Sequence, residues 1–330
     1  MITRGSSKAM AAAVTFACAS SAIGAQSADP AAAFPSRPIR IVIGFTPGGQ
    51  PDITARAVAQ KLTERFGQQV VVDNRPGAGG TIGTKIVADA APDGHTLLSV
   101  SASHAISPAV YAKLPYNTLR DFAGITTTAT SSYMLVVPLT LPVKSVQDLL
   151  ALARAKPGQL NFGSAGNGSG THFAGELLKS TAQLDVVHVP YKGIPEALTD
   201  TMTARVQFFM TPPVTLGTLV KDGKVRALGV TGRKRVPSYP EIPTIAEAGV
   251  PGFVWESWAG ILAPSKTPRP VIDKLNREMT AILKQPEVEQ RFLALGTEPA
   301  PGTPADFDKL VASEITRVME LARKAGIKPQ

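Results

Sequence analysis

The chain has 330 residues, of which 44% are apolar and 18% charged, and it carries a formal net charge of +9 with a single cysteine. This length is typical of two domains of about 150 residues, and the composition is that of a folded globular protein. Composition therefore excludes an intrinsically disordered chain, a collagen and a small disulfide-rich scaffold.

The first 28 residues differ from the rest of the chain. Arg4 and Lys8 precede a short apolar run at residues 10–17, and small residues follow as far as residue 28. This order is typical of a secretory signal peptide, with cleavage near residues 25–28. The apolar run is too short to span a bilayer.

Cleavage there would remove the cysteine, Cys18, together with two positive charges. It would leave 32 of the 34 Lys and Arg against 25 Asp and Glu, a net charge of about +7. The mature chain would then have neither disulfides nor thiolate chemistry. A lipid anchor on Cys18 is the alternative, although Thr15 and Phe16 fit the positions before such an anchor poorly.

Beyond residue 34, short β-rich runs alternate with stretches that have helical spacing. The pattern predicts strands at residues 40–45, 70–72, 95–100, 133–137, 160–163, 186–189, 206–210 and 225–231. It predicts helices at residues 52–66, 81–90, 146–155, 171–180, 271–283, 286–295 and 304–325. This alternation indicates an α/β fold built from βαβ units, with mostly parallel sheets.

Two sheets are expected at this length, and no Gly/Ser linker separates them. The chain is therefore predicted to pass between two α/β lobes along strands near residues 126–130 and 230–232. Lobe 1 would comprise residues 29–127 and 232–330, and lobe 2 residues 128–231. A ligand cleft is expected between the two lobes.

The first predicted strand leads directly into a helix through a loop that reads Thr46-Pro47-Gly48-Gly49-Gln50-Pro51-Asp52. Glycines let the backbone approach a ligand, and the free amides of a helix N-terminus attract an anion. The loop also lies at the carboxyl end of its strand, where open α/β sheets bind ligands. An ordinary strand-to-helix turn, with Asp52 favoured by the helix dipole, is the alternative.

A second loop, at residues 163–172, reads Gly-Ser-Ala-Gly-Asn-Gly-Ser-Gly-Thr-His and also joins a strand to a helix. Its backbone amides and hydroxyls would form a concave set of donors, which favours an anion site. It matches neither the Walker A loop nor the dinucleotide fingerprint. A third glycine-rich turn, at residues 74–80, contains Arg75, which either pairs with a ligand or braces the turn.

The four histidines give little sign of metal or catalytic chemistry. His95 and His188 belong to β-rich runs and are expected to pack, whereas His104 and His172 follow a strand and a glycine-rich loop and are candidates for the cleft. No metal site is expected, because there is no HExxH motif and the mature chain has no cysteine.

Catalysis and nucleic-acid binding are not expected either, and no cofactor motif is present. The sequence has no G-x-S-x-G motif, so an exported serine hydrolase that uses Ser169 and His172 is kept only as a minor alternative. The positive charge is scattered, which disfavours nucleic acid as a partner and mildly favours anionic solutes.

Several motifs together closely resemble the Bug (Bordetella uptake gene) or TctC family of extracytoplasmic solute receptors. They are the segment Phe-Pro-Ser-Arg-Pro-Ile-Arg at residues 34–40, the two glycine-rich loops, the turn Asn-Arg-Pro-Gly-Ala-Gly-Gly at 74–80, Leu-Pro-Tyr at 114–116 before Asp121-Phe122, and Val-Pro-Tyr-Lys-Gly at 189–193. The resemblance extends from residue 34 to the C-terminus.

This resemblance implies a fold like that of type II periplasmic binding proteins, in which two lobes joined by crossing strands close on a small organic anion. It implies a periplasmic, non-enzymatic, monomeric receptor that delivers its ligand to the membrane subunits of a tripartite tricarboxylate transporter. Presentation of the bound ligand to a membrane sensor kinase is the alternative role.

The resemblance and the loop motifs also give a set of candidate ligand-binding residues. These are Phe45, Thr46, Pro47, Gly48, Gly49, Asp52, His104, Ser132, Ser164, Ala165, Gly166, Gly168, Ser169, His172, Tyr191, Thr211 and Pro212, with Lys192 as a further position. Where many relatives carry an acidic residue, this chain reads Gln-Phe-Phe-Met-Thr-Pro-Pro at residues 207–213. We therefore expect a dicarboxylate or an aromatic carboxylate rather than an amino acid.

Overall fold

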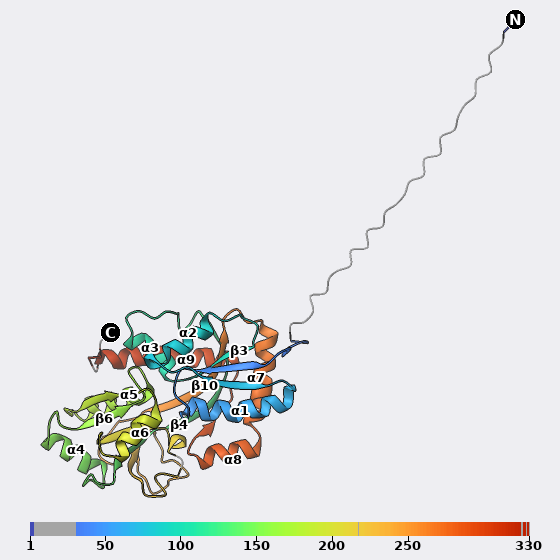
Figure 1. The fold of residues 1–330 in the computed structure, drawn as a ribbon. Coiled ribbons are helices and arrows are strands. Elements are labelled where there is room, and N and C mark those ends of the chain that lie inside the picture. The colour runs from blue at the N-terminus through green and yellow to red at the C-terminus, as the bar shows by residue number, and fades with distance from the viewer. Residues whose placement is uncertain (3–30, 217, 325, 328, 330) are drawn as a thin grey trace.

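The computed structural model describes residues 1–2 and 31–330, apart from residues 217, 325, 328 and 330. The predicted signal peptide therefore lies almost entirely outside the described residues. The described chain forms two α/β lobes, each with its own sheet (Figure 1). The beginning and end of the chain, in blue, cyan and red, build one lobe, and the middle of the chain, in green and yellow, builds the other.

The first sheet has six strands in the order β11-β4-β10-β3-β1-β2. Its parallel part consists of β1 at the centre with β2 and β3 on either side, and β10 runs antiparallel to both β3 and β4. The strands are β1 (Ile39–Ile43), β2 (Val70–Asn74), β3 (Thr96–Ser101), β4 (Phe122–Ser132), β10 (Glu256–Pro264) and β11 (Glu298–Pro299).

Helices cover both faces of this sheet, because successive side chains of a strand point to opposite faces. Ile39, Ile41 and Ile43 of β1 pack against the helices α1 (Gln50–Phe66), α7 (Arg269–Leu283) and α8 (Pro286–Ala294). Val42 packs into the cluster on the other face, with α2 (Thr81–Ala88), α3 (Ser103–Val110) and α9 (Pro304–Lys324).

The second sheet has five strands in the order β7-β6-β8-β5-β9. They are β5 (Met134–Pro138), β6 (Asn161–Ser164), β7 (Val187–Pro190), β8 (Phe208–Thr211) and β9 (Val225–Val230). One face carries α4 (Val146–Ala155) and α5 (Gly170–Thr181), and the other carries α6 (Ile194–Met202). Short 3-10 turns occur at Ala78–Gly80 and Pro213–Thr215.

The expectation of mostly parallel sheets is wrong, because both sheets are mixed. In the first sheet β10 is antiparallel to its neighbours, and in the second sheet β5 is antiparallel to β8 and β9. These are the strands on which the chain arrives from the other sheet. They enter without the crossover helix that makes neighbouring strands parallel, so they run in the opposite direction.

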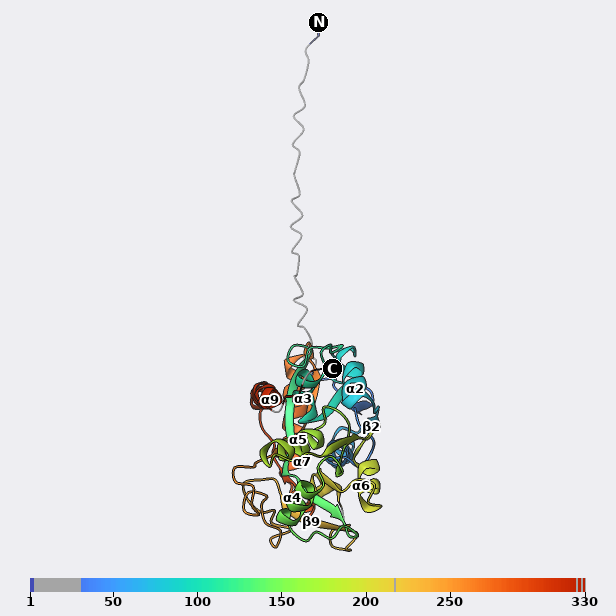
Figure 2. The ribbon, with the colours of Figure 1, turned by 90° about the vertical axis from the view of Figure 1, so that its left-hand side faces the viewer.

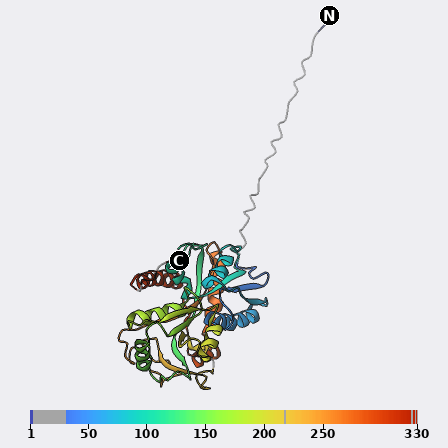
Figure 3. The same cartoon turned by 60° about the vertical axis from the view of Figure 1, so that its left-hand side comes forward.

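The chain passes between the sheets at two places, and these lie side by side, because Ser132 at the end of β4 pairs with Glu256 at the start of β10. Figures 2 and 3 show the two lobes from two further sides. The predicted boundary between residues 127 and 128 falls inside β4, which pairs with β10 as far as Ser132. The segment after β9 stays with the second sheet, since Val236, Tyr239 and Ile242 belong to its core. We therefore propose that lobe 2 extends from residue 133 to about residue 255, with lobe 1 on either side.

No helix among the described residues is both long enough and apolar enough to cross a membrane.

Candidate functional site

A small cavity of about 30 Å³ lies where the two lobes meet. Its wall combines residues of loops from both sheets with Tyr133, which lies between β4 and β5 where the chain crosses from one sheet to the other. The lining residues are Phe45, Thr46, Gly49, Gln50, Pro51, Ser101, Tyr133, Ala165, Ser169, Gly170, Thr171, Ile194 and Pro212. None of them is acidic or basic, so any recognition here depends on neutral donors, helix termini and apolar contact.

Three helices begin at this cavity. The first residues of α1, α5 and α6 all line it, and their N-caps are Gly49, Ser169 and Gly193. The first N–H groups of a helix have no partner within the helix, and the helix dipole places partial positive charge there. Pro51 in α1 and Pro195 in α6 carry no N–H, so the other residues of these first turns supply the donors. Three such termini around one cavity make a site for a negatively charged group without a charged side chain.

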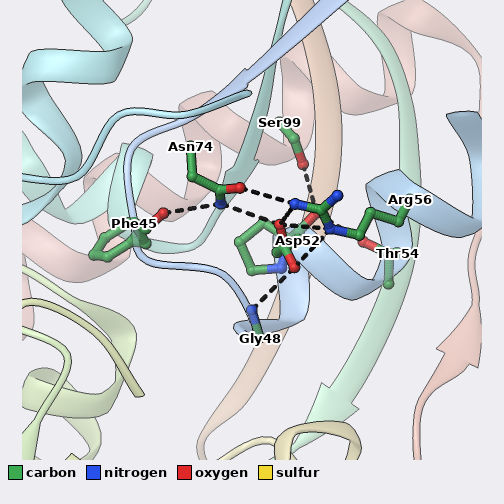
Figure 4. A network of polar contacts seen from close by, with 8 residues as sticks. Phe45, Gly48, Asp52, Thr54, Arg56, Asn74 and Ser99 are labelled. Carbon is green, nitrogen blue, oxygen red and sulfur yellow. Dashed lines mark hydrogen bonds and ion pairs between the residues drawn. The ribbon is translucent and has the colours of Figure 1, made fainter. Parts of the chain in front are cut away.

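The first loop is held from behind by Asp52 (Figure 4). The buried carboxylate accepts hydrogen bonds from Gly48 N at 2.9 Å, from Arg56 Nε at 3.1 Å and from Asn74 Nδ2 at 3.0 Å. Asn74 Nδ2 also donates to the carbonyl of Phe45 at 3.0 Å. Asp52 therefore fixes the conformation of the loop that faces the cavity, and both of its carboxylate oxygens already accept hydrogen bonds from that loop and its neighbours.

The second loop is fixed by its own hydroxyl groups. Ser169 Oγ caps α5 by accepting from His172 N at 3.2 Å, and Thr171 Oγ1 accepts from Ala165 N at 2.8 Å. The turn needs glycine at position 166, where φ is 112°. Gly166 N in turn donates to the buried Ser164 Oγ at 3.0 Å. The loop is thus preorganised by contacts within itself.

Two histidines that are not among the lining residues of the cavity contact this loop. The rings of His172 and His188 stack with centroids 4.0 Å apart, and His188 Nε2 lies 2.6 Å from Ser164 Oγ. Burial lowers the pKa of His172 to about 4 and that of His188 to about 3, so both rings are neutral near pH 7. Gly168 N donates to His172 Nδ1 at 3.4 Å.

This arrangement does not make a catalytic dyad of Ser169 and His172. Ser169 Oγ contacts the backbone N–H of His172 and the hydroxyl of Thr171, and no hydrogen bond links it to the imidazole ring. A serine nucleophile needs its base within hydrogen-bond reach of the hydroxyl. Within the described part of the chain, no three His, Cys, Asp or Glu side chains gather as a metal site would require.

Hydrogen bonds join the two lobes. Thr46 Oγ1 donates to Glu196 Oε2 at 3.2 Å, and Tyr111 Oη donates to the carbonyl of Asn167 at 3.1 Å. The approach is close enough that a β-carbon at Gly193 would lie 1.7 Å from Thr46 Oγ1. The structure therefore has the lobes closed over the cavity.

The predicted site residues fall into three groups. Those that line the cavity are Phe45, Thr46, Gly49, Ala165, Ser169 and Pro212. Those that belong to the same two loops without lining it are Pro47, Gly48, Asp52, Ser164, Gly166, Gly168 and His172. The remaining ones, which lie elsewhere, are His104, Ser132, Tyr191 and Thr211, and Lys192 is exposed.

Each residue of the last group has another environment. His104 is buried between Tyr116 and Phe122, where desolvation lowers its pKa to about 4. The Tyr191 hydroxyl donates to Asp200, and Thr211 shares a hydrogen bond with the hydroxyl of Thr215. These side chains belong to the packing of their lobes.

Ser132 lines a second, larger cavity of about 660 Å³ near the crossing strands. Its wall includes Arg233, Lys234 and Arg317 as well as Glu256 and Glu298. Among the described residues that line it, none begins a helix, and the charged ones are of both signs. The smaller cavity is the better candidate for an anion site, because its donors converge.

Sequence reasoning missed the cavity residues Gln50, Pro51, Ser101, Tyr133, Gly170, Thr171 and Ile194. Gln50 and Gly170 lie in the two glycine-rich loops, directly after the predicted ligand-binding residues Gly49 and Ser169. The loop motifs could therefore have identified them as site residues. Tyr133 comes from the crossing between sheets. Its hydroxyl lies 3.1 Å from Ser257 Oγ, and burial raises its pKa to about 12.

The comparisons with known proteins agree with this fold. The family model described as tripartite tricarboxylate transporter family receptor (TctC) matches residues 54–327. A UPF0065 protein in the tcbD-tcbE intergenic region of Pseudomonas sp. (strain P51) is 42% identical over 290 residues, which cover 88% of this chain and 86% of that protein.

Two solved structures are similar over nearly the whole described chain. R. palustris Rpa4515 with adipate has a TM-score of 0.88 and 36% identity, covering 90% of this chain and all of the other. The periplasmic binding protein BugD has a TM-score of 0.86 and 32% identity, covering 90% and 100%. The predicted two-lobe α/β fold is confirmed. The chain belongs to the TctC family of tripartite tricarboxylate transporter receptors, which its motifs predicted as the Bug family.

Proposed function

We propose that the protein is a periplasmic receptor that closes its two lobes on a small organic carboxylate and delivers it to the membrane subunits of a tripartite transporter. The observation that carries this proposal is the convergence of three helix N-termini on one cavity between the lobes. A carboxylate fits these termini, because it accepts several N–H bonds and is favoured by the helix dipoles.

The ligand is a dicarboxylate or an aromatic carboxylate rather than an amino acid. The described residues that line the cavity include no acidic side chain, so a ligand ammonium group would be buried there without a countercharge. Phe45, Ile194 and Pro212 give the wall an apolar part that suits a hydrocarbon chain or ring. The adipate in the similar R. palustris structure has this character.

The receptor acts as a monomer in the periplasm after its signal peptide is removed, and it needs no cofactor. The scattered positive charge of the mature chain attracts anionic solutes. Presentation of the closed, liganded form to a membrane sensor kinase is the alternative role, and it uses the same ligand site. Neighbouring genes for two transporter membrane proteins, or for a sensor kinase, separate these two roles.

The contacts of the serines in the cavity wall support binding without turnover. Ser101 and Ser169 of the cavity wall each precede a histidine by three residues. Ser101 Oγ lies 3.1 Å from Ser103 Oγ, and Ser169 Oγ caps α5, so the described contacts of both hydroxyls are with groups other than an imidazole ring.

A thermal-shift screen of the mature protein tests this function, with dicarboxylates, aromatic carboxylates and acidic amino acids as probes. A ligand at 100 times its dissociation constant stabilises the folded state by about 2.7 kcal/mol, which raises the melting temperature by about 5 °C for a chain of this size. Calorimetry on each compound that shifts the melting temperature then gives its affinity. Absence of any shift, or tighter binding of amino acids than of simple carboxylates, overturns the proposal.

A further inference from the structure

The larger cavity, of about 660 Å³, is separated from the candidate ligand cavity by side chains of the crossing strands. Gln50 lines the smaller cavity, and its Nε2 donates at 3.0 Å to the hydroxyl of Ser131, which lines the larger one. Tyr133 lines the smaller cavity, and its hydroxyl lies 3.1 Å from that of Ser257, which lines the larger one.

The two cavities therefore lie on opposite faces of the hinge between the lobes. Figure 2 shows α6, which begins at the smaller cavity, and α9, which lines the larger one, on opposite sides of the molecule. A rigid rotation about the crossing strands that widens the space on one face narrows the space on the other. Opening of the ligand cavity therefore narrows the larger cavity.

The charges in the wall of the larger cavity differ between the lobes. Arg233 and Lys234 lie in the segment after β9, which belongs to lobe 2. Glu298 belongs to β11 of lobe 1, and Glu256 is the first residue of β10, where the chain returns to lobe 1. These four residues make the wall positive on the side of lobe 2 and negative on the side of lobe 1.

The other charged residues of this wall have partners within their own lobe. Arg317 Nη2 lies 2.8 Å from Glu314 Oε2, and both residues belong to α9. Arg235 Nε lies 3.0 Å from Glu247 Oε2, and both residues belong to lobe 2. Their charges are compensated whether the lobes are open or closed.

The four charges of the first set have no such partner in the closed form. Within the described part of the chain, Arg233, Lys234, Glu256 and Glu298 are exposed and form no ion pair and no side-chain hydrogen bond. The cavity keeps the positive and the negative side apart. Their attraction rises as the distance falls, so it grows as the lobes open.

We propose that Arg233 and Lys234 form ion pairs with Glu256 and Glu298 across the larger cavity when the lobes open, and that these pairs hold the ligand-free receptor open. The inference rests on the proposed function, because the pairs raise the free energy that a ligand must supply to close the lobes. A ligand that binds the closed form has an apparent affinity in proportion to the closed fraction. Loss of the ion pairs should therefore tighten ligand binding.

Spin labels on the double variant Ile82→Cys/Met202→Cys measure the open and closed fractions without any ligand. Both side chains are exposed, Ile82 in α2 of lobe 1 and Met202 in α6 of lobe 2, and both helices lie on the same side of the molecule in Figure 2. Residues 29–330 contain no cysteine, so the mature protein is labelled at these two positions only. Pulsed electron paramagnetic resonance then gives the distances between the labels.

We expect the longer distance to predominate in the ligand-free protein at about 0.01 M salt and to lose population at about 1 M salt. The electrostatic screening length falls from about 30 Å to about 3 Å over this range, so the ion pairs are weakened. A distribution that salt leaves unchanged contradicts the inference.

Two double variants remove one side of the pairs each, Arg233→Gln/Lys234→Gln and Glu256→Gln/Glu298→Gln. In each, we expect the ratio of open to closed form to fall about two- to fivefold at low salt, as for exposed ion pairs. Since either double variant removes the same pairs, the variant that combines both should show no further fall. Fractions equal to those of the wild type, or effects that add up in the combined variant, overturn the inference.

The matched controls are Lys224→Gln in lobe 2 and Glu289→Gln in lobe 1. Both are exposed charges outside the wall of the larger cavity. They should keep the wild-type distances, and an equal shift in the controls would mean that net charge, rather than pairing across the cavity, sets the equilibrium.

Calorimetry with adipate and succinate separates this inference from the proposed function. We expect both double variants to bind the tighter of these two probes about two- to fivefold more tightly than the wild type at low salt. Unchanged affinity in both variants overturns the inference and leaves the proposed function standing. Absence of binding by either probe in the wild type counts against the proposed function, and the distances measured without ligand then decide the inference.

Discussion

Thr46 Oγ1 and Glu196 Oε2 form a hydrogen bond of 3.2 Å between the lobes, although 150 residues separate them in the chain. Thr46 belongs to the loop before α1, and Glu196 lies in the first turn of α6. The bond therefore exists only when the lobes are closed. Thr46 lines the cavity, and the bond stabilises the closed form, which a bound ligand also stabilises. The bond therefore contributes to the free energy of ligand binding.

Loss of this bond should weaken ligand binding without unfolding either lobe. We expect Glu196→Leu to raise the dissociation constant about three- to tenfold, because a partly buried hydrogen bond to a charged group contributes about 1 kcal/mol. Glu196→Gln keeps an acceptor for Thr46 and should bind nearly as the wild type does. Calorimetry with the carboxylate that gives the largest thermal shift measures both, and equal affinities of the Leu and Gln variants contradict the prediction.

Gly193 sets how closely the lobes approach. Its φ is −172°, which any residue adopts, so alanine is tolerated by the backbone itself. In the closed form, however, its β-carbon would lie 1.7 Å from Thr46 Oγ1. We expect Gly193→Ala to keep its melting temperature without ligand and to lose more than about tenfold in affinity, since the clash is met only on closure.

The control for this substitution is Gly302→Ala. A β-carbon there meets Asp306 at an ordinary 3.6 Å, and the position lies away from the cavity. We expect wild-type affinity for it. Small-angle scattering adds a second measure, because Gly193→Ala should stay extended when ligand is added and the control should become more compact. A Gly193 variant that compacts normally would show that the lobes meet differently.

Substitution of Ser169 has different expected effects in a receptor and in a hydrolase. Its hydroxyl caps α5, and loss of an N-cap costs about 1 kcal/mol of unfolding free energy. We expect Ser169→Ala to lose this stability and some affinity, because the cap also holds the loop at the cavity. The wild type should not hydrolyse carboxylate esters. Turnover that disappears in the Ser169 variant would favour the hydrolase.

Ser145 provides the matched comparison. It caps α4 in the same way, with its side chain accepting from Asp148 N, and it does not line the cavity. Chemical denaturation should show a similar loss of unfolding free energy in Ser145→Ala. Calorimetry should show unchanged affinity for that variant. If both variants lost affinity equally, the effect of Ser169 would be one of general stability.

Much of the fold follows from local pattern. The helix at residues 146–155 is found at the predicted residues, and the two glycine-rich loops stand before α1 and α5 as predicted. These features depend on helical spacing and on glycine at turns, which a short stretch of sequence contains. The local pattern therefore sufficed for the two loops that contribute most of the site.

The rest depends on contacts between distant segments. The helix α6 was not predicted, although Pro195 in its first turn and Glu196 after it are signals for a helix start. The strand β10 contains Gly260 and lies between β3 and β4, which come more than 100 residues earlier, and its pairing leaves no local signal. Tyr133 and Ile194 consequently join the cavity through tertiary structure alone.

His104 provides a test of stability against pH. Burial lowers its pKa in the folded protein to about 4, whereas an exposed histidine titrates near 6.5. The unfolded chain therefore binds the proton more readily, and the folded state loses stability as pH falls from about 6.5 towards 4, by up to about 1.4 kcal/mol per pH unit. In urea unfolding between pH 7.5 and 4.5, the unfolding free energy of His104→Phe should decline less steeply with falling pH than that of the wild type.

The control is Phe122→Leu, which disturbs the same aromatic cluster but removes no titrating group. It should lower the unfolding free energy equally at every pH. A decline in His104→Phe as steep as in the wild type would mean that His104 is protonated in the folded core, against the effect of its burial.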